Sequence, residues 1–216
     1  INESIAIGPI NIFASVCTAS KGKTLDRKTL LERIELFKLI ASRCAPSNSF
    51  LVETTSLDVL TRASTILGVN LDLENATGSL QRSENQTDLC SYYANNSLPI
   101  FILPALALNF IRNRKSFSKQ EFFQFITAIF YITKLEYFLP WDTKNVDKVS
   151  HDILSVFEET KLIRAKSSIF QTCDVGSQEE IISGELASLG ADFIKCLHII
   201  GVFLNSGGDT STKQFK

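Results

Sequence analysis

The sequence lacks most of the features that identify an enzyme or a metal protein directly. Its 216 residues include no methionine, one tryptophan and two histidines, His151 and His198. It contains no G-x-S-x-G nucleophile turn, no glycine-rich phosphate loop and no H-E-x-x-H zinc motif. The two histidines lie far apart in the chain, so we do not expect them to share a metal ion. The sequence therefore predicts neither catalytic residues nor a metal site.

Charge and hydropathy argue against nucleic-acid binding and against a membrane-spanning helix. The net charge is −1, from 22 basic and 23 acidic residues, so no overall field favours nucleic acid or a membrane. The most apolar run, residues 97–111, contains Pro99 and Pro104 and is shorter than the roughly 20 residues that a spanning helix needs. Such a run is typical of a buried helix or of a segment at a membrane surface. Because no methionine starts the sequence, we expect it to belong to a longer polypeptide.

The cysteines and histidines are interpreted as structural residues. No pair of cysteines has the spacing of a metal or redox site, so we expect small buried side chains in a reducing compartment. His151 is expected to be exposed near a helix N-terminus, and His198 to be partly buried. The five cysteines are Cys17, Cys44, Cys90, Cys173 and Cys196.

Helical periodicity is present along most of the chain. Pro9 is placed to start a first helix, and Ser56 and Gly68 to begin and end a third. Alternation over residues 69–73 indicates a short strand. The polar stretch 74–88 indicates a mobile connection, with the next helix starting near its end, at Thr87 or Asp88.

The C-terminal third is predicted to continue the helical pattern. Residues 164–176 form a loop or a short β-turn unit, and Ser177 begins one long helix that reaches residue 204. The whole fold is predicted to be all-α, an irregular bundle of about seven or eight helices with room for one short β-hairpin. Residues 1–206 make up this domain, and 207–216 form a disordered tail.

The densest apolar and aromatic stretch is Tyr92–Trp141. Its two prolines are expected to interrupt or kink its first helix, because proline lacks a donor and clashes with the preceding turn. Ser118 and Glu121 form a capping box that begins a second helix, and Pro140 ends it. That second helix is apolar over a wide arc, so it is predicted to be the buried centre of the fold.

A cationic cluster follows the apolar run. Arg112, Arg114 and Lys115 suit contact with a phosphate, either of a lipid headgroup or of an acyl donor or acceptor. The same charges also suit the negative end of a helix dipole, which is a structural role. Both interpretations stay open at this stage.

Two residues at the end of the aromatic stretch also have two interpretations. Glu136 lies among apolar residues, where it is either a perturbed acid or a structural residue paired with Lys134, Arg112 or Arg114. Trp141 is either a packing anchor at a helix end or a residue of a membrane interface.

The aromatic stretch resembles the C-terminal region of the membrane-associated glycerol-3-phosphate acyltransferases, a family that includes the dihydroxyacetone phosphate acyltransferases. The similarity covers most of the chain and is strongest from Tyr92 to Ile163. Two positions depart from the pattern, since many relatives have Arg where Ala94 stands and His where Pro99 stands. The residues that carry the resemblance are Tyr92, Tyr93, Asn95 and Asn96, then Pro104, Ala105 and Leu106, and finally Leu135, Glu136, Phe138, Leu139 and Trp141.

The resemblance implies an enzyme that transfers a fatty acyl group from acyl-CoA or an acyl-carrier protein to the sn-1 hydroxyl of glycerol 3-phosphate, without a cofactor. The family's catalytic histidine belongs to an H-x-x-x-x-D motif upstream of this region. Here Val156 and Phe203 stand five residues after the two histidines. The resemblance thus implies a segment that is not itself catalytic.

The expected partners are an upstream catalytic domain of the same polypeptide and a membrane surface, and nucleic acid is not among them. The implied location is a cytosol-facing membrane: the mitochondrial outer membrane or endoplasmic reticulum in a eukaryote, or the inner membrane in a bacterium. The alternative is a membrane-peripheral or protein-interaction helical module with no link to acyl transfer.

Overall fold

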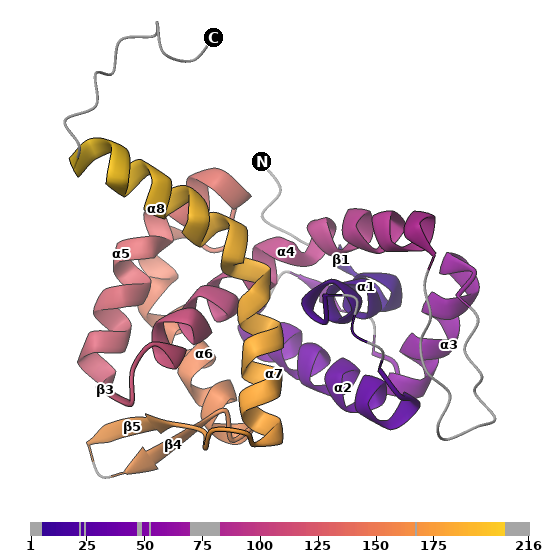
Figure 1. Ribbon diagram of the computed structural model, residues 1–216, viewed down its shortest axis with the longest axis horizontal. Helices are drawn as coiled ribbons and strands as arrows, with labels where there is room; N and C mark the ends of the chain where they lie inside the picture. The colour runs from indigo at the N-terminus through magenta and orange to yellow at the C-terminus, as the bar shows by residue number, and fades with distance from the viewer. Residues whose placement is uncertain are drawn as a thin grey trace, which may run out of the picture.

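The computed structural model describes residues 6–21, 23, 25–46, 49–51, 53–69, 83–166 and 168–205. Within them the chain forms eight α-helices, two short 3-10 helices and five short strands (Figure 1). The predicted helical bundle with a short hairpin is confirmed. The helices are α1 (Pro9–Ala19), α2 (Arg27–Cys44), α3 (Ser56–Leu67), α4 (Glu84–Arg112), α5 (Lys119–Tyr137), η1 (Thr143–Asn145), α6 (Val146–Glu159), α7 (Gln178–Ala187), η2 (Ser188–Gly190) and α8 (Ala191–Asn205). The strands are β1 (Ala6–Ile7), β2 (Phe50–Leu51), β3 (Ser116–Ser118), β4 (Ile163–Lys166) and β5 (Ile169–Thr172).

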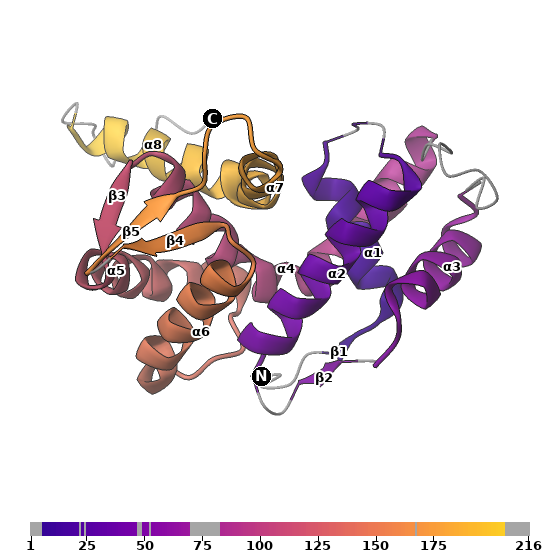
Figure 2. The same cartoon turned by 90° about the horizontal axis from the view of Figure 1, so that it is seen from below.

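The longest helix, α4, is the centre of the fold. It runs across the molecule, with α1, α2 and α3 around its first half and α5 and α7 around its second half (Figure 2). Every residue from Ile100 to Leu108 is buried. Of the two effects expected from the prolines, an interruption or a kink, the interruption is absent, because α4 is continuous through Pro99 and Pro104. Burial of the surrounding apolar side chains offsets a cost of about 3 kcal/mol for each proline inside a helix.

With 29 residues, α4 is also long and apolar enough to cross a membrane. Its most apolar window has a mean hydropathy of 1.4, and 67% of that window is buried inside the protein. A core helix of a folded domain passes the same test of length and composition. Packing within the fold thus accounts for most of the apolar side chains of this helix.

The helices beside the first half of α4 begin and end as their local sequence predicts. Pro9 occupies the first turn of α1. Thr55, one residue before the predicted cap, forms a capping box with Asp58 at the start of α3. Gly68 ends α3 in the left-handed conformation with φ 62°. Strands β1 and β2 form a two-stranded parallel sheet on this side of the molecule.

The prediction that the second aromatic helix is the buried centre was wrong, because α4 takes that place. The helix, α5, starts at the predicted capping box of Ser118 and Glu121. It buries only one stripe of its surface against its neighbours, and Leu135 on the other side is 81% exposed. The buried side chains of α5 are Phe122, Ile126, Phe130 and Thr133.

A three-stranded antiparallel sheet covers one end of α5 and α6. Strands β4 and β5 form a hairpin where residues 164–176 were predicted to be a loop or a short β-turn unit, and β3 adds to its free edge in the order β3-β5-β4. The ring of Phe117 on β3 stacks on Phe170 of β5, with centroids 5.5 Å apart. The third strand was not predicted, because three residues are too few for a periodic signal.

The long helix predicted from Ser177 to residue 204 is divided into α7, η2 and α8. The division lies where the chain passes close to α4: a Cβ added to Gly190 would lie 2.9 Å from Cδ2 of Leu106. Asn109 of α4 donates a hydrogen bond from Nδ2 to the carbonyl of Ala187 at 2.7 Å. Tertiary contact with α4 therefore breaks a helix whose hydrophobic periodicity is continuous.

The start of α4 also differs from the prediction. The helix begins about one turn earlier than expected, with Ser83 and Gln86 forming its capping box. The last residues of the predicted mobile connection are thus helical. The rest of that connection, most of the predicted strand and the predicted tail fall within residues 70–82 and 206–216, which lie outside the described part of the chain.

Candidate functional site

The residues of the family resemblance on α4 divide into buried and exposed groups. Pro104 is buried and Tyr93 is half-buried. Tyr92 is 63% exposed, and Asn95 and Asn96 also face solvent. Pro104 and Tyr93 thus have a packing role within the chain, whereas Tyr92, Asn95 and Asn96 are available for contacts at the surface.

Buried polar contacts fix the position of α1 on α4 beside these residues. Asn11 donates from Nδ2 to the carbonyl of Tyr93 at 3.1 Å, and its Oδ1 accepts from the backbone of Gly8 at 3.0 Å. The hydroxyls of Ser15 and Ser97 lie 2.9 Å apart in the core. Because buried polar groups cost free energy when unpaired, these bonds favour one register of the two helices.

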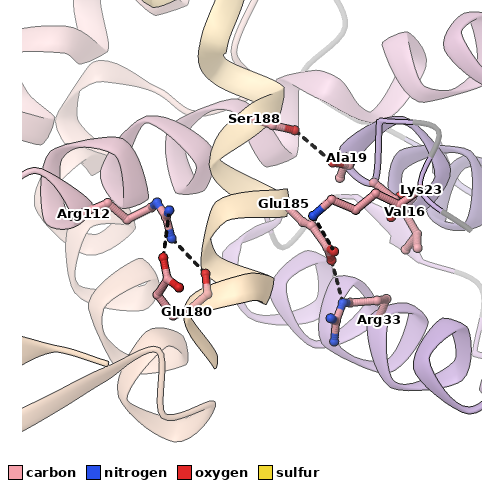
Figure 3. A network of polar contacts seen from close by, with 9 residues as sticks. Val16, Ala19, Lys23, Arg33, Arg112, Glu180, Glu185 and Ser188 are labelled. Atoms are coloured by element: carbon pink, nitrogen blue, oxygen red, sulfur yellow. Dashed lines mark hydrogen bonds and ion pairs between the residues drawn. The ribbon is translucent and has the colours of Figure 1, made fainter. Parts of the chain in front are cut away.

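The predicted cationic cluster lies at the end of α4, and its first member, Arg112, is held in an ion pair. Its Nη2 lies 3.1 Å from Oε1 of Glu180, and its Nη1 donates to the backbone carbonyl of the same residue at 2.8 Å (Figure 3). Its guanidinium also lies against Gly184, where an added Cβ would come within 3.2 Å. Arg112 thus joins α4 to α7.

Arg114 and Lys115 lie beyond the helix end. Arg114 has Nη1 3.8 Å from Oε1 of Glu121, and its guanidinium lies 4.4 Å from the ring centroid of Phe110. Lys115 is exposed and has no ion pair within the described residues. Two of the three charges already have carboxylate partners, which favours the structural interpretation of the cluster over phosphate binding.

A second ion pair, missed by the sequence analysis, is almost fully buried. Nε of Arg33 on α2 lies 2.7 Å from Oε2 of Glu185 on α7, and the two side chains are 3% and 5% exposed (Figure 3). Nζ of Lys23, an exposed side chain, is 3.7 Å from the other oxygen of Glu185. The sequence did carry a signal for this pair. Arg33 lies beside Leu30 and Ile34 in the stripe that α2 buries, and a charge on a buried face needs a partner.

Two further predicted residues, Glu136 and Trp141, lie near the end of α5. Trp141 is 4% exposed, and its Nε1 donates to the carbonyl of Cys44 at 2.9 Å, which supports its interpretation as a packing anchor. Glu136 is exposed, and the ion pair expected for it does not form within the described residues. Of its predicted partners, Lys134 instead donates to the carbonyl of Trp141.

A groove of about 1080 Å³ lies between the end of α5 and the start of α6. Its lining combines exposed apolar side chains of α5 with three lysines and two aspartates. The backbone amide of Lys144 donates to Asp142, which lowers the pKa of that carboxyl and keeps it ionised. The apolar residues of the lining include Tyr131, Leu135, Phe138, Leu139 and Trp141, and the charged residues are Lys134, Lys144, Lys148, Asp142 and Asp152.

The histidines and cysteines of the described residues do not form a catalytic or metal-binding cluster. His151, on α6, and His198, on α8, are both exposed, which corrects the partly buried position expected for His198. Cys196 is exposed, contrary to prediction, whereas burial raises the pKa of the Cys44 thiol. Across the described residues, histidine, cysteine and carboxylate side chains form no group of three that could hold a metal ion.

Comparison with known proteins gives one consistent result. Residues 1–215 match the family described as the glycerol-3-phosphate acyltransferase C-terminal region. Relatives named glycerol-3-phosphate acyltransferase include proteins of Pseudomonas savastanoi pv. phaseolicola and Pseudomonas fluorescens strain Pf-5, each 25% identical over 99% of this chain and 26% of the relative. A protein of the same name from Pseudomonas aeruginosa strain PAO1 is 23% identical over the same shares. The chain thus spans about a quarter of the length of these relatives. From its first residue to residue 215, the chain belongs to the glycerol-3-phosphate acyltransferase C-terminal region family.

Proposed function

We propose that this chain is the non-catalytic, helical C-terminal part of an enzyme that acylates the sn-1 hydroxyl of glycerol 3-phosphate in glycerolipid synthesis. The observation that carries the proposal is the family match over residues 1–215, together with relatives of that name that are about four times as long. The acyl donor is a fatty acyl thioester, of CoA or of an acyl-carrier protein, and no cofactor takes part.

The chemistry of acyl transfer supports a non-catalytic role for this segment. Attack of a hydroxyl on a thioester needs a base to take its proton, and a histidine held by a carboxylate suits that task. Neither His151 nor His198 is followed by an aspartate five residues later. Both side chains are exposed on the outer surfaces of helices rather than held in a cleft. The base therefore belongs to the upstream catalytic part of the polypeptide.

The outer half of α8 is the surface that we assign to that catalytic part. Residues 196–204 of this helix are apolar except for His198. Ile199, Ile200 and Val202 are 66%, 52% and 53% exposed. A helix that is apolar on nearly all sides is stable when other protein or lipid covers it. No lysine or arginine lies between Lys195 and Lys213, which favours protein over an anionic membrane.

The location follows from the substrates. Acyl chains and the lysophosphatidate product both partition into bilayers, so the enzyme works at a membrane surface that faces the cytosol. In a bacterium that surface is the inner membrane, and in a eukaryote it is the mitochondrial outer membrane or the endoplasmic reticulum.

An acyltransferase assay tests the division of roles. The 216-residue chain, and the complete polypeptide that contains it, are incubated with glycerol 3-phosphate and palmitoyl-CoA or palmitoyl-carrier protein. We expect turnover by the complete polypeptide only. The matched control replaces the histidine of its H-x-x-x-x-D motif, which should abolish that turnover. Turnover by the chain alone would contradict the proposal.

The alternative function is a membrane-peripheral or protein-interaction module unrelated to acyl transfer. The exposed apolar side chains of α5 and α8 also suit such a module. The open reading frame that contains the chain separates the two. An H-x-x-x-x-D motif encoded before Ile1 supports the enzyme, whereas an unrelated domain there supports the module.

A further inference from the structure

The end of α5 presents a stripe of large apolar side chains that no other part of the described chain covers. Tyr131 and Leu135 are spaced i and i+4, so they share one face of the helix, and Phe138 follows directly after the last helical residue as its C-cap. They are 53%, 81% and 74% exposed. All three line the groove between α5 and α6. The buried stripe of α5 lies on the opposite side, so the packing of the fold does not require these side chains.

Phe138 reaches the groove from an unfavourable backbone conformation. It caps α5 in the left-handed region, with φ 51° and ψ 48°. That region suits glycine or asparagine, and a bulky residue there is an outlier. The conformation carries the ring into solvent, where it gains little from packing. A strained and exposed aromatic side chain at a helix end indicates a role outside the fold.

Lysines accompany the apolar stripe. Lys134, Lys144 and Lys148 line the same groove, and Lys144 has Nζ 3.3 Å from Asp142, the nearest facing acid. Asp152 is the other acid of the groove lining. The groove therefore carries one more positive than negative charge beside its apolar wall.

We propose that the end of α5 is the contact between this domain and an anionic lipid surface. Leu135 and Phe138 enter the acyl region, and the lysines of the groove lie at the level of the headgroup phosphates. Apolar side chains between lysines are typical of interfacial membrane binding. Lysine is depleted in protein interfaces, which also need about 800 Å² on each partner, so a protein occupant fits this narrow stripe less well. The inference deepens the proposed function by naming the membrane contact, and its test does not use acyl transfer.

Vesicle co-sedimentation of the 216-residue chain tests the proposal. The vesicles consist either of phosphatidylcholine with phosphatidylglycerol or of phosphatidylcholine alone. We expect stronger binding to the anionic vesicles. Changing Leu135→Ser with Phe138→Gly should lower binding at least about tenfold, because two large apolar side chains no longer enter the bilayer. Changing Lys144→Gln with Lys148→Gln should lower binding to the anionic vesicles alone, by roughly fivefold per lysine.

Matched controls separate a lipid contact from a general loss of apolar surface or of charge. Leu57→Ser with Ile66→Ser removes two exposed apolar side chains of α3, at the opposite end of the molecule (Figure 1). Lys28→Gln with Lys195→Gln removes two exposed charges elsewhere. Both control variants should bind as the unchanged chain does. Phe138→Gly alone should keep or raise the thermal midpoint, because glycine relieves the left-handed backbone. This single variant should also bind anionic vesicles less tightly, and unfolding cannot explain that loss.

The only tryptophan reports which face meets the lipid. Trp141 lines the same groove, so phospholipids with brominated acyl chains should quench its fluorescence when the chain binds. The proposal is overturned if the unchanged chain ignores anionic vesicles, or if the Leu135 and Phe138 variant binds as well as the unchanged chain. Binding without quenching at Trp141 would place the contact on another face. Any of these results leaves the acyltransferase assay, and the proposed function, to be judged separately.

Discussion

Arg33 and Glu185 join α2 to α7 through a buried ion pair, although 152 positions separate them in the sequence. The guanidinium Nε donates to the carboxylate at 2.7 Å. Nη1 of Arg33 is buried and has no hydrogen-bond partner within the described residues. Burial of two charges costs several kcal/mol for each ion before pairing repays it. The pair therefore specifies where α7 docks more than it stabilises the fold.

Removal of one partner of this pair should be costly. We expect Glu185→Ala to lower the free energy of unfolding by about 3–5 kcal/mol, because it leaves a buried guanidinium without its carboxylate. The double change Arg33→Met with Glu185→Leu should recover most of that loss. Urea denaturation measures both. Glu32→Ala, which breaks a 3.9 Å exposed pair with Lys28, serves as a control and should change stability by less than about 0.5 kcal/mol. An equal loss in the double and single variants would contradict this account.

The amide of Asn109 should matter for the break between α7 and α8. It donates to the carbonyls of Ala105 at 2.9 Å and Ala187 at 2.7 Å. Asn109→Ala leaves the carbonyl of Ala187 without this donor, so we expect a loss of about 1–3 kcal/mol in the free energy of unfolding. Asn113→Ala removes a similar but exposed bond to the carbonyl of Asn109 and should cost much less. Equal losses in the two variants would show that the hydrogen bond to Ala187 adds nothing to stability.

Two left-handed residues give opposite predictions for glycine. Gly68 has φ 62° and open space around it, so Gly68→Ala should cost about 1 kcal/mol through backbone conformation alone. Lys161 has φ 60° and an exposed side chain. Lys161→Gly should therefore raise the free energy of unfolding by about 0.5 kcal/mol, after the larger entropy of the unfolded chain is allowed for. Thermal unfolding checks both signs, and a shift in the same direction for the two variants would refute the argument.

Helix-capping carboxylates predict a loss of stability in acid. The backbone amide of Thr29 donates to Asp26 and holds the pKa of that carboxyl below its ordinary value of 3.8. Ser118 in the same way holds the pKa of Glu121 below 4.5. A lowered folded-state pKa stabilises the fold above the unfolded pKa, and this contribution is lost as the pH falls through the folded value. The loss should therefore begin as the pH drops below about 4.5 and continue below 3.8.

The variant Asp26→Asn isolates one of these carboxylates. Asparagine still caps the helix but does not titrate, so the difference in unfolding free energy from the unchanged chain should shrink as the pH falls below 3.8. Urea denaturation over a pH series measures it. If this difference in unfolding free energy stays constant down to the most acidic pH, the carboxylate of Asp26 is not a source of the acid sensitivity.

Thiol reactivity should distinguish Cys196 from the four buried cysteines. It lies exposed on α8, whereas burial raises the pKa of Cys44 and of Cys173 and keeps each of them in the unreactive thiol form. Ellman's reagent should thus label one thiol rapidly in the folded chain and all five in denaturant. Cys196→Ser should abolish the rapid phase. Rapid labelling that survives this change would show that a second thiol is accessible.

Local chemistry made several of the helix boundaries predictable. The capping box of Ser118 and Glu121, the proline in the first turn of α1 and the glycine after α3 each act within a few residues, so the sequence carries the whole signal. The buried stripe of α6 was predictable in the same way, because Val149, Ile153 and Phe157 recur at helical spacing.

Long-range contacts were not predictable, because one sequence does not say which apolar face meets which. Both α4 and α5 are apolar over wide arcs, and only the packing decides that α4 is central while Leu135 remains exposed. The same holds for the cationic cluster. Its position at the end of an apolar helix could be predicted, but the pairing of Arg112 with Glu180 depends on how α7 folds back.

The two prolines of α4 have a consequence for how the domain melts. Each proline lacks a backbone amide donor, so α4 has two fewer helical hydrogen bonds. This is the helix that both groups of neighbouring helices share. The isolated segment should be a poor helix, so its order depends on partners from both sides at once. Unfolding of the helices on either half of α4 then destabilises the helices on the other half. Amide hydrogen exchange in α1 and in α7 should therefore give the same free energy of opening.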